Sequence, residues 1–242
     1  MLKTLVLDIE TSPIIAYVWG LKDQNIGLNQ IVKDWQVIAF AAKWLGEKKV
    51  RYEDVRNAGT EEELLIPLWN LLNEADIVIT QNGQSFDGPK LNARFVYYSM
   101  PCPSPYRHLD TYRIAKRVFE FTSNKLEYLT DKLCTKYKKL DHSKFPGMSL
   151  WRECLNNNIK AWNEMKRYNI HDVLSTEEMY NKIKAWAPET MPKPFAHVSS
   201  RICAVCGKGH VESKGWRYAN KLKYQRLHCL DCGTWSKGEK LK

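Results

Sequence analysis

An apolar, partly β-branched run, Leu2 to Ile9, carries two carboxylates, Asp8 and Glu10, at its end. The run is closed by Pro13 and predicts a buried central strand that leads into a loop. Residues two apart on a strand project from the same face, so both carboxylates are expected on one side of the strand's end. Carboxylates repel one another and are costly to desolvate. The fold around this strand therefore has to supply a cation.

The remaining pattern predicts an α/β domain in which strands are combined with amphipathic helices. Further strands are expected at Trp35 to Trp44, Lys48 to Val55 and Asp76 to Thr80. The last of these is parallel to the first strand if the helix that begins after Thr60 is a crossover. Helices are also expected to begin at Asp87 and to span about 110–120, 125–134 and 159–186, whereas 12–34 is expected to be irregular and 100–105 to be a loop.

The size and composition indicate a globular protein. The chain has 242 residues, and an apolar content of 44% is enough for a proper core. No apolar run approaches the length of a membrane span, and the first strand begins too early to leave room for a signal peptide. We therefore expect a cytoplasmic protein with no membrane partner.

The positive charge is concentrated in the C-terminal part of the sequence. The formal net charge is +10, yet residues 193–242 hold 11 Lys and Arg against 3 Asp and Glu, and residues 1–192 hold 26 against 24. This distribution suits an enzyme that holds an anionic substrate partly through an accessory module. The alternative is that the charged tail only improves solubility.

Two Cys-x-x-Cys pairs in this tail predict a metal site. The pairs are separated by 22 residues, which is zinc-ribbon spacing, and each is followed by a glycine that permits a tight turn. Four thiolates close the coordination sphere, so one structural Zn²⁺ is expected to drive the folding of this small module. A redox role is the alternative, as is the replacement of one cysteine by His210 or His228. The expected ligands are Cys203, Cys206, Cys229 and Cys232, whereas Cys102, Cys134 and Cys154 are expected to be reduced thiols.

A proline-rich segment separates this module from the rest. Pro188, Pro192 and Pro194 predict an extended linker. The expected organisation is a domain at 1–187, a linker at 188–200 and a zinc ribbon at 201–242.

More acidic side chains follow other predicted elements. Asp87 comes after a strand in the sequence NGQSFD, and Tyr168 and Asp172 lie one turn apart on the long late helix. Mg²⁺ and Mn²⁺ prefer oxygen ligands, and two such ions promote in-line displacement at a phosphodiester. Asp8, Glu10, Asp87 and Asp172 are a sufficient ligand set for two ions, and the Tyr168 hydroxyl is placed to orient the attacking water.

The three fragments together resemble a known family. Asp8-Ile-Glu10-Thr11, Asn82-Gly-x-x-Phe86-Asp87 and Tyr168-x-x-x-Asp172 are similar to the three motifs of the DEDD superfamily of 3′-to-5′ exonucleases. Enzymes of its DEDDh branch carry a histidine five residues before the last aspartate, where this chain has Arg167. The position of Tyr168 resembles the DEDDy branch, as in the proofreading domains of family A and B DNA polymerases and in stand-alone phage or bacterial relatives.

This resemblance covers residues 1–186 and implies both fold and function. It implies a ribonuclease-H-like mixed β-sheet flanked by helices, and the release of nucleoside 5′-monophosphates from a 3′ end by a two-metal mechanism. The four acids would be the metal ligands and Tyr168 would position the water. Single-stranded DNA is the expected substrate, in DNA replication or repair, and the location would be the host cytoplasm if a phage encodes the chain. Singly, each of these residues has an ordinary structural interpretation, as a helix cap, a solvated acid or a helix-surface pair.

Other residues are candidates for substrate binding. Thr11, Asn82 and Phe86 adjoin the motif acids, although Phe86 is equally expected in the core. Asp110 is expected to cap a helix, with a site role as the second interpretation. In the tail, rings and cations alternate in a pattern typical of single-strand binding, although some of the rings are expected to fill the small core. These tail residues are Trp216, Arg217, Tyr218, Lys221, Lys223, Tyr224 and Arg226.

Several functional alternatives remain open at this point. A 3′-to-5′ exoribonuclease is the nearest, because no residue unambiguously reads a 2′-hydroxyl. A structure-selective endonuclease on the same fold and a catalytically inactive accessory protein that binds nucleic acid are the others. The zinc ribbon has two expected partners, nucleic acid or replication proteins.

Overall fold

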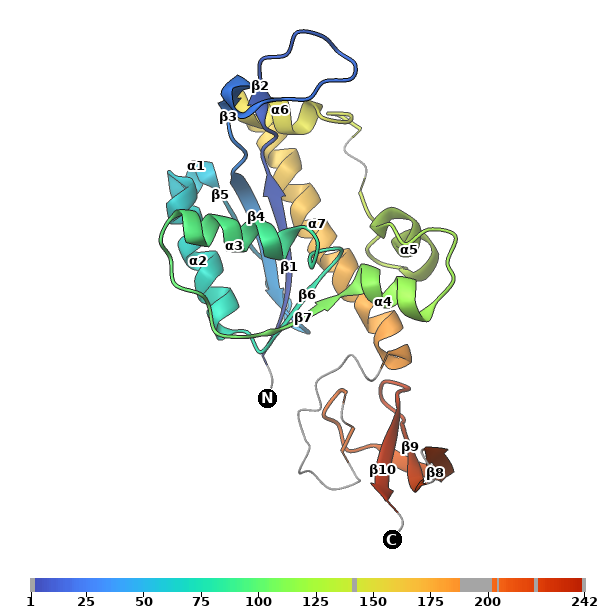
Figure 1. The fold of residues 1–242 in the computed structure, drawn as a ribbon. Coiled ribbons are helices and arrows are strands. Elements are labelled where there is room, and N and C mark those ends of the chain that lie inside the picture. The colour runs from blue at the N-terminus through green and yellow to red at the C-terminus, as the bar shows by residue number, and fades with distance from the viewer. Residues whose placement is uncertain (1–2, 141–142, 188–201, 204, 220–221, 241–242) are drawn as a thin grey trace.

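The computed structural model describes residues 3–140, 143–187, 202–203, 205–219 and 222–240. A five-stranded mixed sheet with the order β5-β4-β1-β6-β7 forms its centre (Figure 1). β1 pairs antiparallel with β4, and β4 pairs antiparallel with β5, whereas β6 and β7 continue the sheet in parallel on the other side of β1. These strands are β1 (Thr4–Thr11), β4 (Val37–Trp44), β5 (Arg51–Asp54), β6 (Ile77–Thr80) and β7 (Arg107–Asp110).

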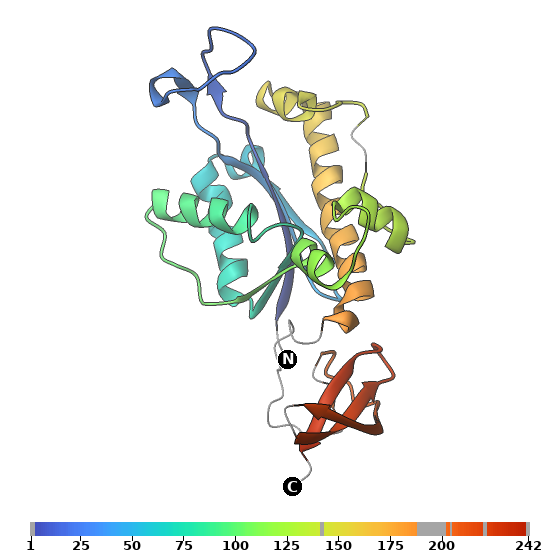
Figure 2. The ribbon, with the colours of Figure 1, turned by 45° about the vertical axis from the view of Figure 1, so that its right-hand side comes forward.

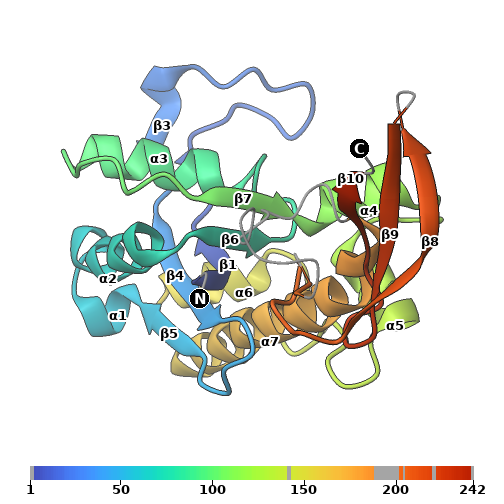
Figure 3. The same cartoon turned by 90° about the horizontal axis from the view of Figure 1, so that it is seen from below.

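Helices cover both faces of this sheet, as Figures 2 and 3 show. One face is covered by α2 (Glu61–Glu74) and α3 (Asp87–Tyr97), and the other by α6 (Ser149–Leu155) and the long α7 (Ile159–Ile183). The remaining helices are α1 (Val55–Ala58), α4 (Thr111–Val118) and α5 (Leu126–Leu133), with short 3-10 turns at Leu28–Gln30 and Lys184–Trp186.

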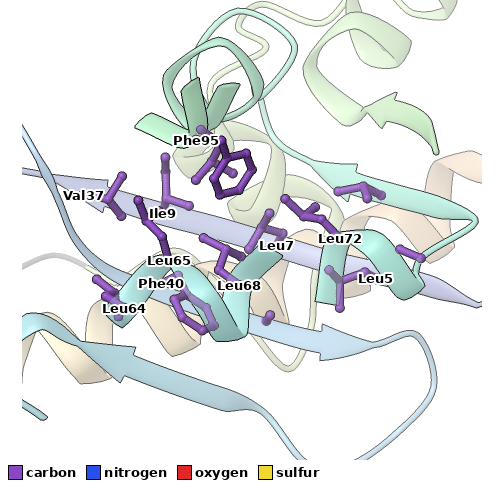
Figure 4. Packing of buried hydrophobic residues seen from close by; sticks show 14 residues of the cluster. Leu5, Leu7, Ile9, Val37, Phe40, Leu64, Leu65, Leu68, Leu72 and Phe95 are labelled. Carbon is purple, nitrogen blue, oxygen red and sulfur yellow. The ribbon is translucent and has the colours of Figure 1, made fainter. Parts of the chain in front are cut away.

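The side chains of β1 alternate between two hydrophobic layers. Leu5, Leu7 and Ile9 pack against leucines of α2 and against Phe95 of α3 (Figure 4). Val6 points to the opposite face, where it packs in a cluster that includes residues of α7. Strand alternation therefore also sends the residues at 8 and 10 to the α7 face, away from the apolar layer in Figure 4.

Within residues 3–187 most of the predicted elements are present, but β7, α1, α6 and a small strand pair in 12–34 were not predicted. β7 has the sequence Arg-His-Leu-Asp, which lacks the apolar run of a buried strand and follows a proline-rich loop. The helix expected around 110–120 therefore begins at Thr111, after this strand. The segment expected to be irregular at 12–34 contains a small antiparallel pair, β2 (Ile15–Ala16) and β3 (Ile31–Lys33), and α6 was not predicted.

The C-terminal part, residues 202–240, contains a three-stranded antiparallel sheet. Its order is β10-β9-β8, with β8 at Val211–Ala219, β9 at Leu222–Cys229 and β10 at Trp235–Lys240. The predicted linker at 188–200 lies outside the described residues. Among the helices that the structure describes, none combines the length and apolar character needed to cross a membrane.

Candidate active site

The carboxyl end of β1 brings Asp8 and Glu10 to the α7 face of the sheet. Their register partners on β4 are Ala41 and Ala39, which belong to the two hydrophobic clusters on that face. The small alanines leave this part of the face open to the longer carboxylates. Helical side chains meet both acids: the Asn169 amide donates to Asp8 Oδ2 at 2.6 Å, and the Trp151 indole donates to Glu10 Oε2 at 3.0 Å.

Asp87 reaches the same end of the sheet from the first turn of α3. Its Oδ1 accepts a hydrogen bond from the backbone N–H of Ile9 at 3.1 Å, so it is tied to the strand between the other two acids. The preceding loop is tight: Asn82 has a φ of +63°, a left-handed conformation that asparagine tolerates. An added Cβ at Gly83 would lie 2.8 Å from Asp87 Oδ2 and would also collide with Thr80. Glycine at 83 therefore lets the Asp87 carboxylate lie where it does.

Tyr168 and Asp172 are both buried on the face of α7 that covers the sheet. The Lys139 ammonium, from the segment between α5 and α6, donates to Asp172 Oδ2 at 2.9 Å and lies 4.9 Å from the centre of the Tyr168 ring. Tyr168 itself interacts through hydrogen bonds with Asp172 and Lys139. One cation and one phenol therefore accompany the acid that α7 supplies.

The four carboxylates are held close enough to repel one another. Burial raises the pKa of Asp8 well above its ordinary value, and the charges of Asp172, Asp87 and Glu10 raise it further. Burial, followed by the charge of Asp172, raises the pKa of Glu10 to about 8, although the Trp151 hydrogen bond opposes the shift. Burial also raises the pKa of Asp87 to about 7, against the hydrogen bond from Ile9. Without a cation, the group does not hold all of its negative charge at neutral pH.

Asp172 and Tyr168 follow the same trend. Burial raises the pKa of Asp172 even though Lys139 lowers it, and burial together with the charge of Asp172 raises the pKa of the Tyr168 hydroxyl. Tyr168 is therefore a neutral hydrogen-bond donor across the physiological range. For Lys139, burial opposes the charged form, but Asp172 and Tyr168 outweigh burial and raise the pKa.

These donors fit divalent cations by their chemistry. Asp172 Oδ1 is buried and has no hydrogen-bond partner, so one ligand oxygen is left unsatisfied inside the site. The surrounding ligands are carboxylate oxygens, which Mg²⁺ and Mn²⁺ prefer. Among the described residues, the carboxylates are more widely spread than the cysteines of the C-terminal part, whose ligand atoms all lie within 4.8 Å of one another.

Comparison with known proteins places this site in a family. The sequence profile described as the RNase H superfamily matches residues 5–184, which include all four acids and Tyr168. This chain belongs to the RNase H superfamily. The predicted fold class, an RNase H-like mixed sheet flanked by helices, is thereby confirmed.

Solved structures of other proteins share the fold of this chain. Among 111 chains that match the RNase H-superfamily chain is the family B DNA polymerase from the hyperthermophilic archaeon Pyrobaculum calidifontis, with a TM-score of 0.54 and 13% sequence identity. The alignment covers 93% of this chain and 32% of the polymerase, so the chain spans about a third of the length of that relative. A search of curated proteins gave no match.

The other residues predicted near the acids of the RNase H-superfamily domain lie in varied environments. Thr11 is the last residue of β1, and Asn82 uses its backbone N–H to donate to Asp110 at 2.9 Å. Phe86 precedes α3 and is 40% exposed, so the core interpretation of this ring is wrong. Asp110 caps α4, as expected, by accepting from the backbone N–H groups of Tyr112 and Arg113.

Sequence reasoning missed three residues that contact the site: Asn169, Trp151 and Lys139. Asn169 had a signal, because it lies three residues before Asp172 on the same buried helix face. Trp151 lies on a helix that was not predicted, and its ring centre is 6.3 Å from that of Tyr168. Lys139 lies in a segment without periodicity. Nothing in the local sequence around Trp151 or Lys139 indicates a contact with the acids.

The four cysteines of the C-terminal part form a compact tetrad. Cys203 Sγ lies 3.7 Å from Cys232 Sγ, and Cys206 Sγ lies 3.6 Å from Cys229 Sγ. A tetrahedral ion with metal–sulfur bonds of about 2.3 Å would separate its sulfur ligands by roughly 3.8 Å. The tetrad therefore fits zinc. The other three cysteines are free thiols, with Cys134 and Cys154 buried and Cys102 exposed.

The alternating rings and cations of this part do not share one surface. Lys223 and Arg226 are three residues apart on β9, so they lie on opposite faces of the sheet. The Lys223 ammonium is 5.0 Å from the centre of the half-exposed Trp216 ring, whereas the Arg226 guanidinium is 5.0 Å from the Trp235 ring. Tyr224 is half-buried. Arg217 and Tyr218 are described by their backbone in β8 alone, and Lys221 lies outside the described residues.

Proposed function

We propose that this chain is a metal-dependent 3′-to-5′ exonuclease that acts on single-stranded DNA and releases nucleoside 5′-monophosphates. The observation that carries the proposal is the convergence of Asp8, Glu10, Asp87 and Asp172 at one end of the sheet, with the Tyr168 hydroxyl beside them. These acids come from β1, α3 and α7, and the fold bears the cost of their mutual repulsion. A surface used only for binding an anion has no need of four clustered acids, three of which, Glu10, Asp87 and Asp172, are buried.

In this proposal, Asp8, Glu10, Asp87 and Asp172 hold two Mg²⁺ or Mn²⁺ ions. When bound, these ions supply Lewis-acid activation of water and neutralise charge on the phosphodiester. The chain fixes the orientation of its acids in advance, because Asn169, Trp151 and the Ile9 N–H each hold one of them. Such fixed outer contacts sharpen the geometry of a metal site.

Tyr168 and Lys139 complete the site in this proposal. The Tyr168 hydroxyl remains protonated at neutral pH. Its proton, which Asp172 accepts in the described structure, would orient the attacking water once Asp172 binds a metal ion. The Lys139 ammonium places a positive charge where an anionic strand has to approach four acids. The Trp151 ring packs edge-on against Tyr168 and excludes solvent from one side of the phenol.

The cysteine tetrad is assigned one structural Zn²⁺, and residues 201–242 are assigned the role of an accessory zinc ribbon. Cys203 and Cys229 are buried, and the four sulfurs leave no open coordination position for a substrate. The ribbon's Trp216, with Lys223 beside it, offers a ring and a cation to an unpaired base and its phosphate.

A labelled-oligonucleotide assay tests the nuclease. A single-stranded DNA labelled at its 5′ end is incubated with Mg²⁺, Mn²⁺ or a chelator, beside Asp8→Ala and Asp172→Ala. The expected result is a ladder that shortens from the 3′ end with either metal and is absent with the chelator and in both variants. Degradation by the variants at the parent's rate would show that the acids are not the active site.

Two further substrates separate the remaining functions. A matched RNA oligonucleotide distinguishes a deoxyribonuclease from an exoribonuclease, and faster degradation of RNA would replace DNA as the assigned substrate. A closed circle of single-stranded DNA has no 3′ end, so its cleavage would overturn the exonuclease assignment in favour of an endonuclease. Binding of all substrates without cleavage under any metal condition would identify an inactive accessory protein.

A further inference from the structure

A second anionic-ligand site is suggested by a cavity that none of the four motif acids lines. The cavity has a volume of about 320 Å³ and is lined by residues of the edge strand β7 and of α4, two elements labelled in Figure 1. Its charged lining comes from Arg107 on β7 and from Arg113 and Arg117 on α4. Arg113 and Arg117 are one helical turn apart and therefore share a face of α4.

Positive charge exceeds negative charge in the sequence around this cavity. Residues 107–117 contain four Lys and Arg and a single acid, Asp110, whereas residues 1–192 as a whole are nearly neutral. All three lining arginines are exposed residues, so an anionic ligand can reach the cavity from solvent. Arginine is the residue best suited to hold a phosphate through paired hydrogen bonds.

The one acid in the lining is occupied elsewhere. Asp110 is 2% exposed, and its carboxylate accepts backbone N–H groups from Asn82, Gln84, Tyr112 and Arg113 at 2.9–3.3 Å. Its contact with Arg113 is long, with 3.9 Å between Arg113 Nε and Asp110 Oδ2. Asp110 therefore shapes the cavity through its backbone hydrogen bonds and makes only a long ionic contact with Arg113.

The cavity is connected to the loop that positions Asp87. Gln84, in the NGQSFD segment, lines the cavity, and its side chain donates to the carbonyl of His108 at 2.7 Å. Arg113 donates to the Ser85 hydroxyl at 3.2 Å. The segment that ends at Asp87 thus also contacts the cavity and one of its arginines.

From this arrangement we infer that the cavity binds backbone phosphates of the nucleic-acid strand, away from the scissile bond. Arg107, Arg113 and Arg117 hold the strand by its charge and not by its sequence. This inference rests on the proposed function for the identity of the strand, but the binding itself requires no catalysis. Within the RNase H-superfamily domain, β7 and α4 would then contact the nucleic acid, and this contact is separate from any made by the basic C-terminal part.

Binding in a chelator tests the site independently of cleavage. The full-length chain and Arg117→Gln are titrated with a fluorescent single-stranded DNA of about twenty nucleotides over a range of salt concentrations. Arg117→Gln is expected to weaken binding about tenfold, as for the loss of one charged hydrogen bond. It is also expected to lower the slope of log K against log salt by about 0.7 for each phosphate that the variant no longer neutralises. Arg107→Gln, on the opposite wall, is expected to have the same two effects.

Lys116→Gln is the matched control, because Lys116 is an exposed cation on the same helix and does not line the cavity. If Lys116→Gln weakens binding as much as Arg117→Gln, the effect is one of general charge and the cavity assignment is overturned. An effect of Arg117→Gln on the binding of thymidine 5′-monophosphate but not on the oligonucleotide would also overturn it, in favour of a nucleotide site.

Hydrolysis of a small substrate separates this inference from the proposed function. The p-nitrophenyl ester of thymidine 5′-monophosphate is too short to occupy both sites, so Arg117→Gln is expected to cleave it at the parent's rate while KM for the oligonucleotide rises. A parent that cleaves neither substrate refutes the proposed nuclease and leaves the binding comparison intact. Unchanged oligonucleotide binding and salt slope in both arginine variants refute the cavity assignment and leave the nuclease intact.

Discussion

The carboxylate site and the cysteine tetrad gather metal-ligating groups in two different ways. The acids lie on a fold that already has a large core, formed by β1, β4, α2, α3 and α7. The tetrad lies in the small C-terminal part, where the buried described residues are Cys203, Leu227, Cys229 and Thr234. Two of those four are themselves metal-ligand candidates. Loss of metal should therefore cost the first region its chemistry and the second region its structure.

The two sets of ligands are also held together by different interactions. The acids are separated along the chain by up to 164 positions. The hydrophobic packing of β1 against α7 on one face and against α3 on the other keeps them together with or without an ion. The cysteines sit in two tight turns, and little else in the described part of the module holds those turns together. The carboxylate site should therefore remain folded without a metal ion. The C-terminal part, whose buried described residues include two of the candidate zinc ligands, should not.

The largest effect is expected from breaking the tetrad. Cys229→Ser removes a buried sulfur ligand, and structural zinc contributes about 10–16 kcal/mol to the folding of comparable small modules. We expect the variant to lose its zinc and the protection of β8–β10 amides in hydrogen exchange, while β1 and α7 remain protected. Cys154→Ser is the control, since Cys154 is buried in the core against α7. Loss of protection in β1 upon Cys229→Ser would contradict the separation of the two regions.

The next largest effect is expected at the acids, and it should be catalytic. Asp8→Asn removes a charge that the other acids repel, so the free energy of unfolding is expected to stay constant or rise. Loss of a metal ligand removes several kcal/mol of transition-state stabilisation, which lowers the cleavage rate about a thousandfold or more. Cleavage of the labelled strand and thermal unfolding measure the two quantities.

Asp54→Asn is expected to behave in the opposite way to Asp8→Asn, with a loss of stability and no loss of activity. Asp54 is fully buried on the same sheet, but its carboxylate is paired with Arg56 at 2.7 Å and caps α1. Its replacement should lower stability by about 1–3 kcal/mol, as for a lost buried hydrogen bond and helix cap, and leave the cleavage rate of the folded protein unchanged. If Asp54→Asn and Asp8→Asn changed the same quantity, the distinction between a structural and a catalytic acid would be lost.

A smaller effect is expected at Tyr168. Tyr168→Phe keeps the ring that packs against Trp151 and removes the hydroxyl, so the cleavage rate is expected to fall about a hundredfold with little change in metal binding. The raised pKa of this hydroxyl means that its ionisation does not shape the rate between pH 7 and 9. Tyr180→Phe removes a buried hydroxyl from the same helix, away from the acids, and should leave the rate unchanged. Equal rate losses in both variants would reduce Tyr168 to a packing role.

The parts of this site that were predictable are those encoded by local periodicity. The spacing of Asp8 and Glu10 on a strand and of Tyr168 and Asp172 on a helix fixes which side chains share a face. The contacts of Trp151 with Glu10 and of Lys139 with Asp172 join segments more than thirty positions apart and leave no periodic trace. The same reason explains β7, whose charged sequence becomes a strand because β6 offers it an edge. Asp110 was predicted as a cap, but its second task, tying down the loop before Asp87, depends on that pairing.

The smallest effect is expected when the stability of the RNase H-superfamily domain without metal is measured as a function of pH. Burial raises the pKa of Glu10 to about 8 and that of Asp87 to about 7, so the folded chain keeps protons that the unfolded chain releases near pH 4. The stabilisation by these protons is fully present below about pH 4 and is lost as the pH rises to about 8. In a chelator, Tm should therefore fall between pH 5 and 8, by about 2–4 °C per kcal/mol.

Added Mg²⁺ should reverse this trend, because the ion favours the ionised acids, and its stabilising effect should be larger at pH 8 than at pH 6. Glu10→Gln should remove part of the pH dependence and part of the Mg²⁺ effect. Glu62→Gln, in the exposed first turn of α2, should change neither. The tetrad again provides the contrast. In buffer without a chelator, zinc binding to thiolates strengthens as the pH rises, so the zinc-loaded C-terminal module should gain stability over the same interval. If the stability of both regions changed with pH in the same direction, they would form one metal-dependent folding unit and not two.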